Sequence, residues 1–169
     1  VGGSISCESK PGKGTTFRFT VALQVGSMQE LNEQKWEETI AADFAGKRIL
    51  LVEDNVLNRE IARDILEDEG FAVEEADDGD VAVEKLRWSQ PGYYDIVLMD
   101  IQMPKMDGYE ATRQIRRIDS GYCRNIPIIA LTANAFEEDK RAAKQAGMSG
   151  HIAKPIKVEA LRQELTRCL

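Results

Sequence analysis

The chain has 169 residues, of which 43% are apolar, 30% charged and 7% aromatic, an ordinary composition for a globular protein. Its 22 Lys and Arg against 29 Asp and Glu give a formal net charge of -7, which argues against nucleic acid as a direct partner. No apolar run approaches the roughly 20 residues that cross a bilayer, and residues 1–30 lack the basic-then-apolar order of a signal peptide, so a cytoplasmic location is expected.

Residues 1–23 are predicted to form a β-hairpin. A turn cluster at 10–14 is followed by residues 16–23, in which apolar and polar side chains alternate. Because an isolated hairpin is at best marginally stable, it is expected to pack on another segment, to self-associate or to be the edge of a larger domain, and we favour the last. Residues 24–45 are polar and are interpreted as a linker, in which the spacing of Trp36, Ile40 and Phe44 favours a short helix over 29–44.

From residue 46 onward, short apolar runs alternate with longer amphipathic stretches. Strands are expected near 48–53, 72–76, 95–100, 126–131 and 150–153. Runs of aliphatic residues of this length suit strands that are buried on both faces, and a helix is expected after each strand. This pattern predicts an α/β fold, a (βα)5 doubly wound parallel five-stranded sheet, with its ligand crevice at the carboxyl ends of the strands.

The expected helices have recognisable ends and faces. Gly70 and Gly147 stand where glycine commonly ends a helix, and Asp107 with Glu110 resembles a capping box. Aliphatic residues recur at helical spacing in the first and last of these helices (Leu57, Ile61, Ile65; Leu161, Leu165, Leu169).

Polar residues stand where four of the apolar runs end. They are Glu53 and Asp54 after the first run, Asp100 after the third, Thr132 after the fourth, and Lys154 with Pro155 after the fifth. Parallel strands present their carboxyl ends to one edge, so these side chains should converge. Three crowded carboxylates repel one another unless a cation joins them, and Mg2+ that shares its ligands with a phosphate fits such a site. The alternative, that each acid merely caps the next helix, is reasonable for any one of them but weak for all together.

Asp100 is the expected phosphoryl acceptor because it is the lone acid at the end of a central strand, whereas Glu53 and Asp54 can both hold a metal. A carboxylate can act as a nucleophile and form an acyl phosphate. Lys154 supplies a point charge for a phosphoryl oxygen, and Thr132 supplies a hydroxyl hydrogen bond.

Cysteine and histidine are scarce. Cys7, Cys123 and Cys168 are odd in number and far apart, so neither a disulfide framework nor a thiolate metal site is indicated. The single histidine, His151, excludes a multi-histidine metal site.

Residues 48–169 resemble the receiver domain of two-component response regulators, in particular the receivers attached to hybrid sensor histidine kinases. The resemblance rests on ILLVEDN (49–55), LMDIQMPKMDG (98–108), IIALTA (128–133), Gly147-Met148 and Lys154-Pro155. It implies a flavodoxin-like strand order 2-1-3-4-5. It also implies phosphorelay signal transduction, in which Asp100 receives a phosphoryl group from the phosphohistidine of a histidine kinase or a histidine phosphotransfer domain.

The resemblance assigns roles to the surrounding residues. Mg2+ would be held by Asp54, Asp100 and the backbone carbonyl of Gln102, with Glu53 assisting through water. The phosphoryl oxygens would be contacted by Lys154, Thr132 and the backbone amide of Ala133. Gln102 and Asn134 occupy the positions at which the family varies the lifetime of the acyl phosphate, and the Lys154–Pro155 bond is implied to be cis.

The family couples phosphorylation to a switch in which Thr132 moves and a residue of the last strand rotates inward. That residue here is His151, where many receivers carry Tyr or Phe, so the amplitude of the switch stays open. Two interpretations of His151 compete: a partly buried ring that fills the switch pocket, which we favour, or a histidine that relays phosphoryl groups or senses pH. Between residues 135 and 146 the only large apolar side chain is Phe136, so this helix is expected to move, and the surface from it through the last strand to the last helix is the expected signalling face.

Residues 1–23 resemble the final glycine-rich segment and strands of a histidine-kinase ATP-binding domain, which the linker would join to a receiver over residues 46–169. The parent protein would be a hybrid histidine kinase, for which a membrane anchor and a homodimer both stay open. Other ATP-binding motifs are absent, and residues 12–15 lack P-loop spacing, so we expect no ATP binding by this chain. Whether the chain is itself an enzyme, through phosphoryl transfer and aspartyl-phosphate hydrolysis, stays open.

Three rival functions share parts of this pattern. A phosphatase or phosphotransferase with an aspartate nucleophile would need a second acid two residues after the first, and Gln102 stands there. A flavin or dinucleotide binder would need a glycine-rich or hydroxyl-rich loop after the first strand, where Glu53 and Asp54 would repel a phosphate. A non-phosphorylated interaction module of the same fold is the third alternative.

Overall fold

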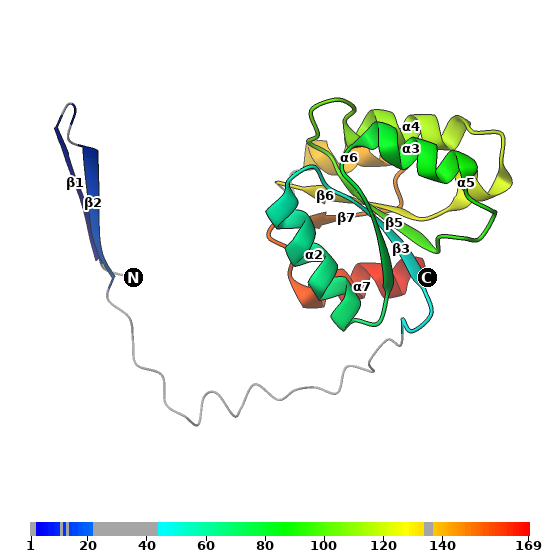
Figure 1. Ribbon diagram of the computed structural model, residues 1–169, viewed down its shortest axis with the longest axis horizontal. Helices are drawn as coiled ribbons and strands as arrows, with labels where there is room; N and C mark the ends of the chain where they lie inside the picture. The colour runs from blue at the N-terminus through cyan, green and yellow to red at the C-terminus, as the bar shows by residue number, and fades with distance from the viewer. Residues whose placement is uncertain (1–2, 11, 13, 22–43, 134–136) are drawn as a thin grey trace, which may run out of the picture. The chain divides into compact units, whose positions relative to one another are not determined.

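The structure is a computed structural model that describes residues 3–10, 12, 14–21, 44–133 and 137–169 (Figure 1). The chain divides into two units, residues 1–41 and 42–169, and each is described by itself. Most of the expected linker helix, together with Asn134 and Phe136, lies outside the described residues.

The first unit contains the predicted hairpin. Strand β1 (Gly3–Lys10) pairs antiparallel with β2 (Gly14–Val21). Gly12 and Gly14 have φ of 74° and 95°, a left-handed conformation that glycine adopts without strain and that a tight connection requires. Ile5, Phe17 and Phe19 are all exposed. The hairpin therefore presents apolar side chains that nothing in the described part of this unit covers.

The second unit is built on one parallel sheet of five strands. These are β3 (Arg48–Val52), β4 (Ala72–Ala76), β5 (Ile96–Asp100), β6 (Ile128–Thr132) and β7 (Gly150–Ala153). Their order is β4-β3-β5-β6-β7, which confirms the flavodoxin-like order 2-1-3-4-5. Strand β6 begins at Ile128 rather than at Ile126, because Ile126 ends a short helix and Pro127 has no amide hydrogen to donate.

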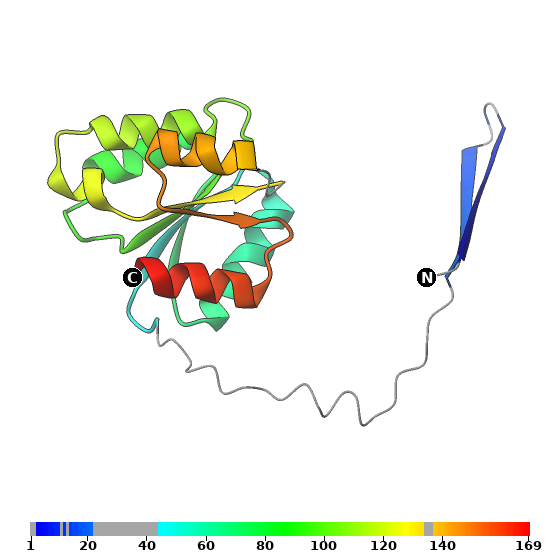
Figure 2. The same ribbon diagram turned by 180° about the vertical axis from the view of Figure 1, so that it is seen from behind.

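Helices cover both faces of this sheet (Figures 1 and 2). One face carries α2 (Val56–Asp68) and α7 (Val158–Cys168). The other carries α3 (Gly79–Trp88), α4 (Gly108–Arg117), α5 (Gly121–Asn125) and α6 (Glu137–Ala146). Gly70 and Gly147 have φ of 94° and 96° beyond the ends of α2 and α6, and the Asp107 side chain accepts a hydrogen bond from the Glu110 amide at 2.8 Å. The expected helix ends are thus confirmed, and α5 is an additional turn of helix.

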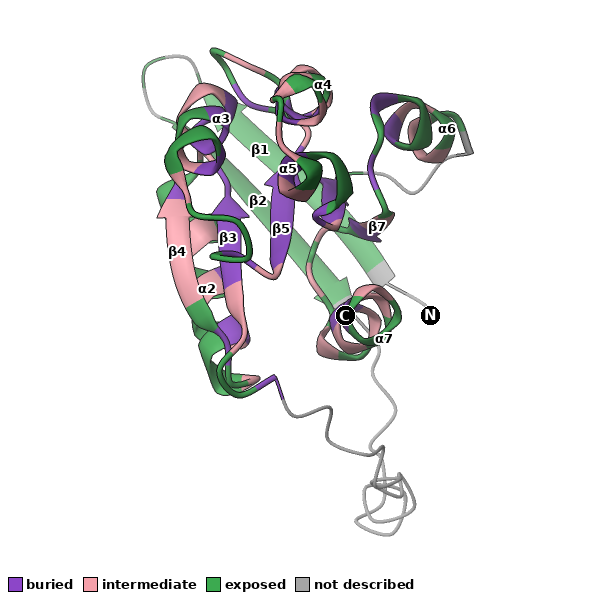
Figure 3. Ribbon diagram, turned by 90° about the vertical axis from the view of Figure 1, so that its right-hand side faces the viewer, coloured by how far each residue is buried: buried purple, intermediate pink, exposed green. Residues whose placement is uncertain are grey.

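The core lies in two layers, one on each side of the sheet, and strand β5 is buried throughout (Figure 3). Helix α7 packs with Leu161 and Leu165 inward, as their spacing indicates, whereas Leu169 is exposed. In α2 the buried residues are Ala62 and Leu66, each one position beyond an apolar residue of the expected stripe, and one position turns a side chain by about 100° around the helix. No helix in the described ranges is long and apolar enough to span a membrane.

Candidate functional site

Three acidic side chains meet at the carboxyl edge of the sheet. Glu53 follows β3 directly and Asp100 ends β5, and these strands are adjacent, with Val52 paired to Met99. One carboxylate oxygen from each of Glu53, Asp54 and Asp100 lies within 4.8 Å of the others. Glu53 and Asp100 are only 2% and 4% exposed, whereas Asp54 is half-buried. The convergence expected from the parallel topology is therefore present.

Lys154 lies against two of these carboxylates. Its Nζ donates to Glu53 Oε2 at 2.5 Å and to Asp100 Oδ2 at 2.7 Å, and it reaches them from the turn after β7. The Lys154–Pro155 bond is cis, as the resemblance implies. Burial by itself lowers the pKa of Lys154, but its hydrogen bonds to Asp100 and Glu53 outweigh this effect and raise the pKa above its ordinary value. Lys154 is therefore a cation, and it neutralises part of the acidic cluster.

One ammonium does not balance three carboxylates. Burial raises the pKa of Asp100 and the Glu53 carboxylate adds to the rise, although the hydrogen bond from Lys154 opposes it. A further positive charge at this position would stabilise the ionised form of Asp100. The donors are all carboxylate oxygens, which suit a hard divalent cation such as Mg2+. The residues present thus fit a magnesium ion in number, in chemistry and in charge.

The remaining expected phosphoryl ligands lie at the same edge. Thr132 is the last residue of β6 and is buried, and its carbonyl accepts from the Lys154 amide at 2.7 Å. Ala133 follows it and is exposed, as is Gln102, whose amide donates to Asp100 Oδ1 at 3.2 Å.

The structure separates His151 from the acidic cluster. His151 pairs with Ala130 in the sheet and lines a hollow of about 490 Å3 between α6 and α7, together with Lys144 and Arg167. It is placed on the expected signalling face.

Two residues of the first turns of α2 support the site and were not foreseen. Asn58 Nδ2 donates to Glu53 Oε1 at 3.1 Å. Arg59 Nη1 donates to the Glu53 carbonyl at 2.7 Å, and its Nε contacts Glu75 at 3.2 Å. Their signal in the sequence is weak, because only the helical turn beginning at Asn55 brings residues five and six positions beyond Glu53 back toward it.

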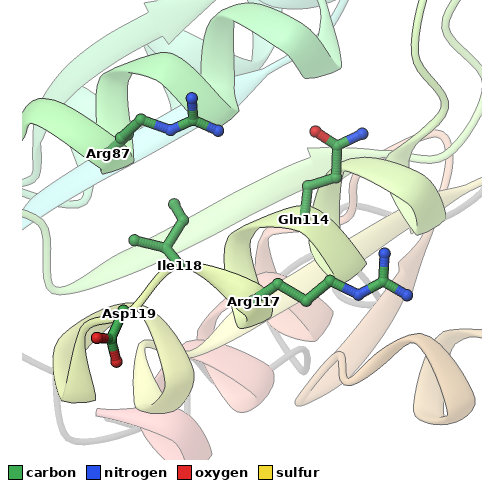
Figure 4. A pocket seen from close by; sticks show the side chains of 5 residues that line it. All are labelled: Arg87, Gln114, Arg117, Ile118 and Asp119. Atoms are coloured by element: carbon green, nitrogen blue, oxygen red, sulfur yellow. The ribbon is translucent and has the colours of Figure 1, made fainter.

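A separate hollow of about 420 Å3 lies where α3 and α4 end (Figure 4). Its lining consists of Arg87, Gln114, Arg117, Ile118 and Asp119. Helices that follow parallel strands end at the amino edge of the sheet, so this hollow lies away from the acidic cluster. It lacks the grouped carboxylates that mark the carboxyl edge.

Comparisons with known proteins agree with this geometry. Residues 49–166 match the model of the response regulator receiver domain. The chain is 36% identical over 165 residues to the sensor histidine kinase AruS of Pseudomonas aeruginosa, a match that covers 98% of the chain and 16% of AruS. The chain thus spans about a sixth of the length of that relative.

Two solved structures are similar to this one. The receiver domain of sensor histidine kinase PA1611 from Pseudomonas aeruginosa, with a magnesium ion coordinated in its active-site cleft, is 43% identical with a TM-score of 0.65, over 73% of this chain and 98% of that one. The receiver domain of Ssk1 in complex with the histidine phosphotransfer protein Ypd1 from Saccharomyces cerevisiae is 30% identical with a TM-score of 0.63, over 72% and 88%. These matches do not favour the three rival functions.

Proposed function

This chain belongs to the response regulator receiver domain family, and from that premise we propose that residues 46–169 accept a phosphoryl group from a partner's phosphohistidine onto Asp100. The observation that carries the proposal is the buried Asp100 carboxylate, grouped with Glu53 and Asp54 and paired with Lys154. In the reaction a carboxylate oxygen of Asp100 attacks phosphorus, the bond from phosphorus to the imidazole nitrogen breaks, and the product is an acyl phosphate.

Each residue of the site would have a separate role in this transfer. Lys154 is held beside the nucleophile, where its ammonium can pair with a phosphoryl oxygen. Thr132 and the amide of Ala133 would donate hydrogen bonds to the other oxygens. Mg2+, held by Asp54, Asp100 and the Gln102 carbonyl with Glu53 acting through water, would supply positive charge against the phosphoryl group.

A protein rather than a small molecule is the donor that this surface favours. Val56, Leu57 and Ile61 are 60%, 64% and 51% exposed, on the helix that begins directly after the acidic pair. A hollow of about 120 Å3 connects this helix to Glu53 and Lys154. Exposed aliphatic side chains beside a reactive group are typical of a docking surface, so we infer a histidine kinase or a histidine phosphotransfer domain as donor and acceptor.

The signal would leave through α6, β7 and α7. Helix α6 buries the small side chains Ala143 and Ala146 among its described residues, so little apolar area holds it to the sheet. His151 lies on this face, and a movement of Thr132 toward a phosphoryl group would leave space for it to turn. We infer that Gln102 and Asn134 tune the lifetime of the acyl phosphate.

For the rest of the chain we infer a fragment of a hybrid histidine kinase. Residues 1–23 would be the tail of its ATP-binding domain and residues 24–45 the linker, of which Phe44 packs on Phe71 in the core of the second unit. The division of the chain into two units after residue 41 and the match to AruS across 98% of the chain support this proposal. The exposed apolar side chains of the hairpin would then pack on the remainder of that domain. The receiver would act in the cytoplasm, and this chain would not bind ATP.

The test is phosphorylation in the presence of Mg2+ by a small phosphodonor and by a phosphorylated histidine phosphotransfer domain. We expect an acid-stable, base-labile adduct that is lost in Asp100→Asn. The matched control is Asp107→Asn, which alters an exposed acid directly before α4. This variant should be labelled normally. Unchanged labelling of Asp100→Asn would contradict the proposal.

A further inference from the structure

Asp78 is a buried carboxylate that the site described above does not include. It precedes α3 and is 2% exposed. Its Oδ1 accepts from the amides of Gly79 at 2.8 Å and Met106 at 2.9 Å, and its Oδ2 accepts from the amide of Lys105 at 3.2 Å. A carboxylate out of water is costly unless it is hydrogen-bonded, and bonds to an ionised acceptor are the strong ones. Asp78 therefore binds the start of α3 firmly to a loop 27 and 28 residues further along the chain.

The packing around Asp78 leaves that loop little room. A Cβ at Gly79 would lie 2.5 Å from the Met106 carbonyl oxygen and 3.0 Å from the Ala111 side chain, so the loop rests directly on the backbone of α3. Met103, nearer the start of the loop, is buried in the core on the same side of the sheet. The middle of the loop thus contacts the start of α3 directly.

Both ends of the same loop contact Asp100. The amide of Gln102 donates to Asp100 Oδ1 at 3.2 Å, and the amide of Gly108 donates to the Ile101 carbonyl at 3.0 Å. A Cβ at Gly108 would lie 2.2 Å from the carbonyl oxygen of Asp100. A displacement of residues 105 and 106 would therefore be transmitted to the backbone that orients Asp100 and Gln102.

We propose that Asp78 is a positioning residue for the phosphoryl-transfer site, which sets the place of the Gln102 backbone and of the Asp100 carboxylate by holding the loop over residues 101–107. The inference rests on the proposed function of Asp100. Asp78 touches neither the reacting atoms nor the acidic cluster. Loss of such an outer partner typically lowers metal affinity by about 10-fold to 100-fold.

The test compares Asp78→Ser with Asp78→Asn. Serine keeps a hydroxyl that can cap α3 but is too short to reach both loop amides, whereas asparagine keeps one acceptor oxygen. The matched control is Asp80→Ser, since Asp80 lies in the same helical turn and its carboxylate accepts from the Val81 amide at 2.8 Å. Mg2+ affinity by calorimetry and the amide resonances of Gln102, Lys105 and Met106 by NMR without metal are measured for each folded variant.

We expect the Mg2+ dissociation constant to rise about 10-fold in Asp78→Ser, less in Asp78→Asn and not at all in Asp80→Ser. The Gln102 amide resonance should move in the same order. A folded Asp78→Ser protein with wild-type Mg2+ affinity and an unmoved Gln102 resonance would overturn the inference. If that variant does not fold, Asp78→Asn is judged by the same two measurements. A wild-type protein that binds Mg2+ but is not phosphorylated would refute the function of Asp100, while these measurements would still decide the role of Asp78.

Discussion

Replacing Lys154 by methionine removes the positive charge between two buried carboxylates and keeps most of the side-chain volume. Lys154 contacts Glu53 and Asp100 at 2.5 and 2.7 Å, and those acids are 2% and 5% exposed at their side chains. Breaking a buried ion pair from one side costs about 3–5 kcal/mol. Because the Lys154 side chain is itself 24% exposed, water offsets part of this cost, and we expect a loss of about 3 kcal/mol without metal.

A loss of this size should lower Tm by on the order of 10 °C in a domain of this length. Saturating MgCl2 should return much of the stability, since it supplies the missing charge, and Asp100→Asn in the Lys154→Met background should also return part of it without metal. Thermal and urea denaturation measure both effects. Lys157→Met is the control, as Lys157 is exposed and lies three positions further along. A Lys154→Met protein as stable as wild type without metal would refute this reasoning.

The other predictions concern Asp100, the metal and the loop. Burial raises the pKa of the Asp100 carboxyl above its ordinary value of 3.8, so the folded protein binds the carboxyl proton more tightly than the unfolded chain does. The free energy of unfolding should therefore fall as pH rises from the unfolded-state pKa through the folded-state pKa of Asp100. Urea denaturation without Mg2+ should show that Asp100→Asn becomes more stable relative to wild type between about pH 4 and pH 7. A difference in unfolding free energy that stays constant over this range would contradict the raised pKa. Mg2+ at 100 times its Kd should add about 2.7 kcal/mol to the free energy of unfolding, and at that concentration Asp54→Ala should gain much less. Gly108→Ala should lose about 3 kcal/mol by denaturation and weaken phosphorylation, since its Cβ would clash with the Asp100 carbonyl oxygen at 2.2 Å, whereas Gly121→Ala has nothing within 4 Å and should lose little.

Local patterns were sufficient for most of the fold of residues 46–169. The aliphatic runs predicted the three central strands β3, β5 and β6, because strands buried on both faces need apolar side chains at nearly every position. The edge strands β4 and β7 are only partly buried and were predicted from their alternation with amphipathic stretches. Helix α5 was not predicted, because its five residues are too few to show a helical periodicity of apolar side chains. The apolar spacing of Leu57 and Ile61 predicted helix α2 but not its buried face. Both side chains are exposed near the site, and apolar residues also occur on protein surfaces.

The candidate site was predictable where it depends on topology alone. Parallel strands bring their ends to one edge, so Glu53 and Asp100 could be placed together from their positions after apolar runs. The supporting contacts of Arg59 and Asp78 could not, because each depends on the path of a loop or helix rather than on a strand end. The pairing of Lys154 with Glu53 as well as with Asp100 likewise follows only from the position of the turn after β7.

The most direct measurement of the central claim is to locate the phosphoryl group. The chain is phosphorylated in the presence of Mg2+ and then treated with borohydride, which reduces an aspartyl phosphate to homoserine, and the altered residue is identified by peptide mass spectrometry. We predict homoserine at position 100 in wild type and at no position in Asp100→Asn. Homoserine at position 53 or 54, or a stable phosphoryl group elsewhere in the chain, would contradict the assignment of Asp100 as the acceptor.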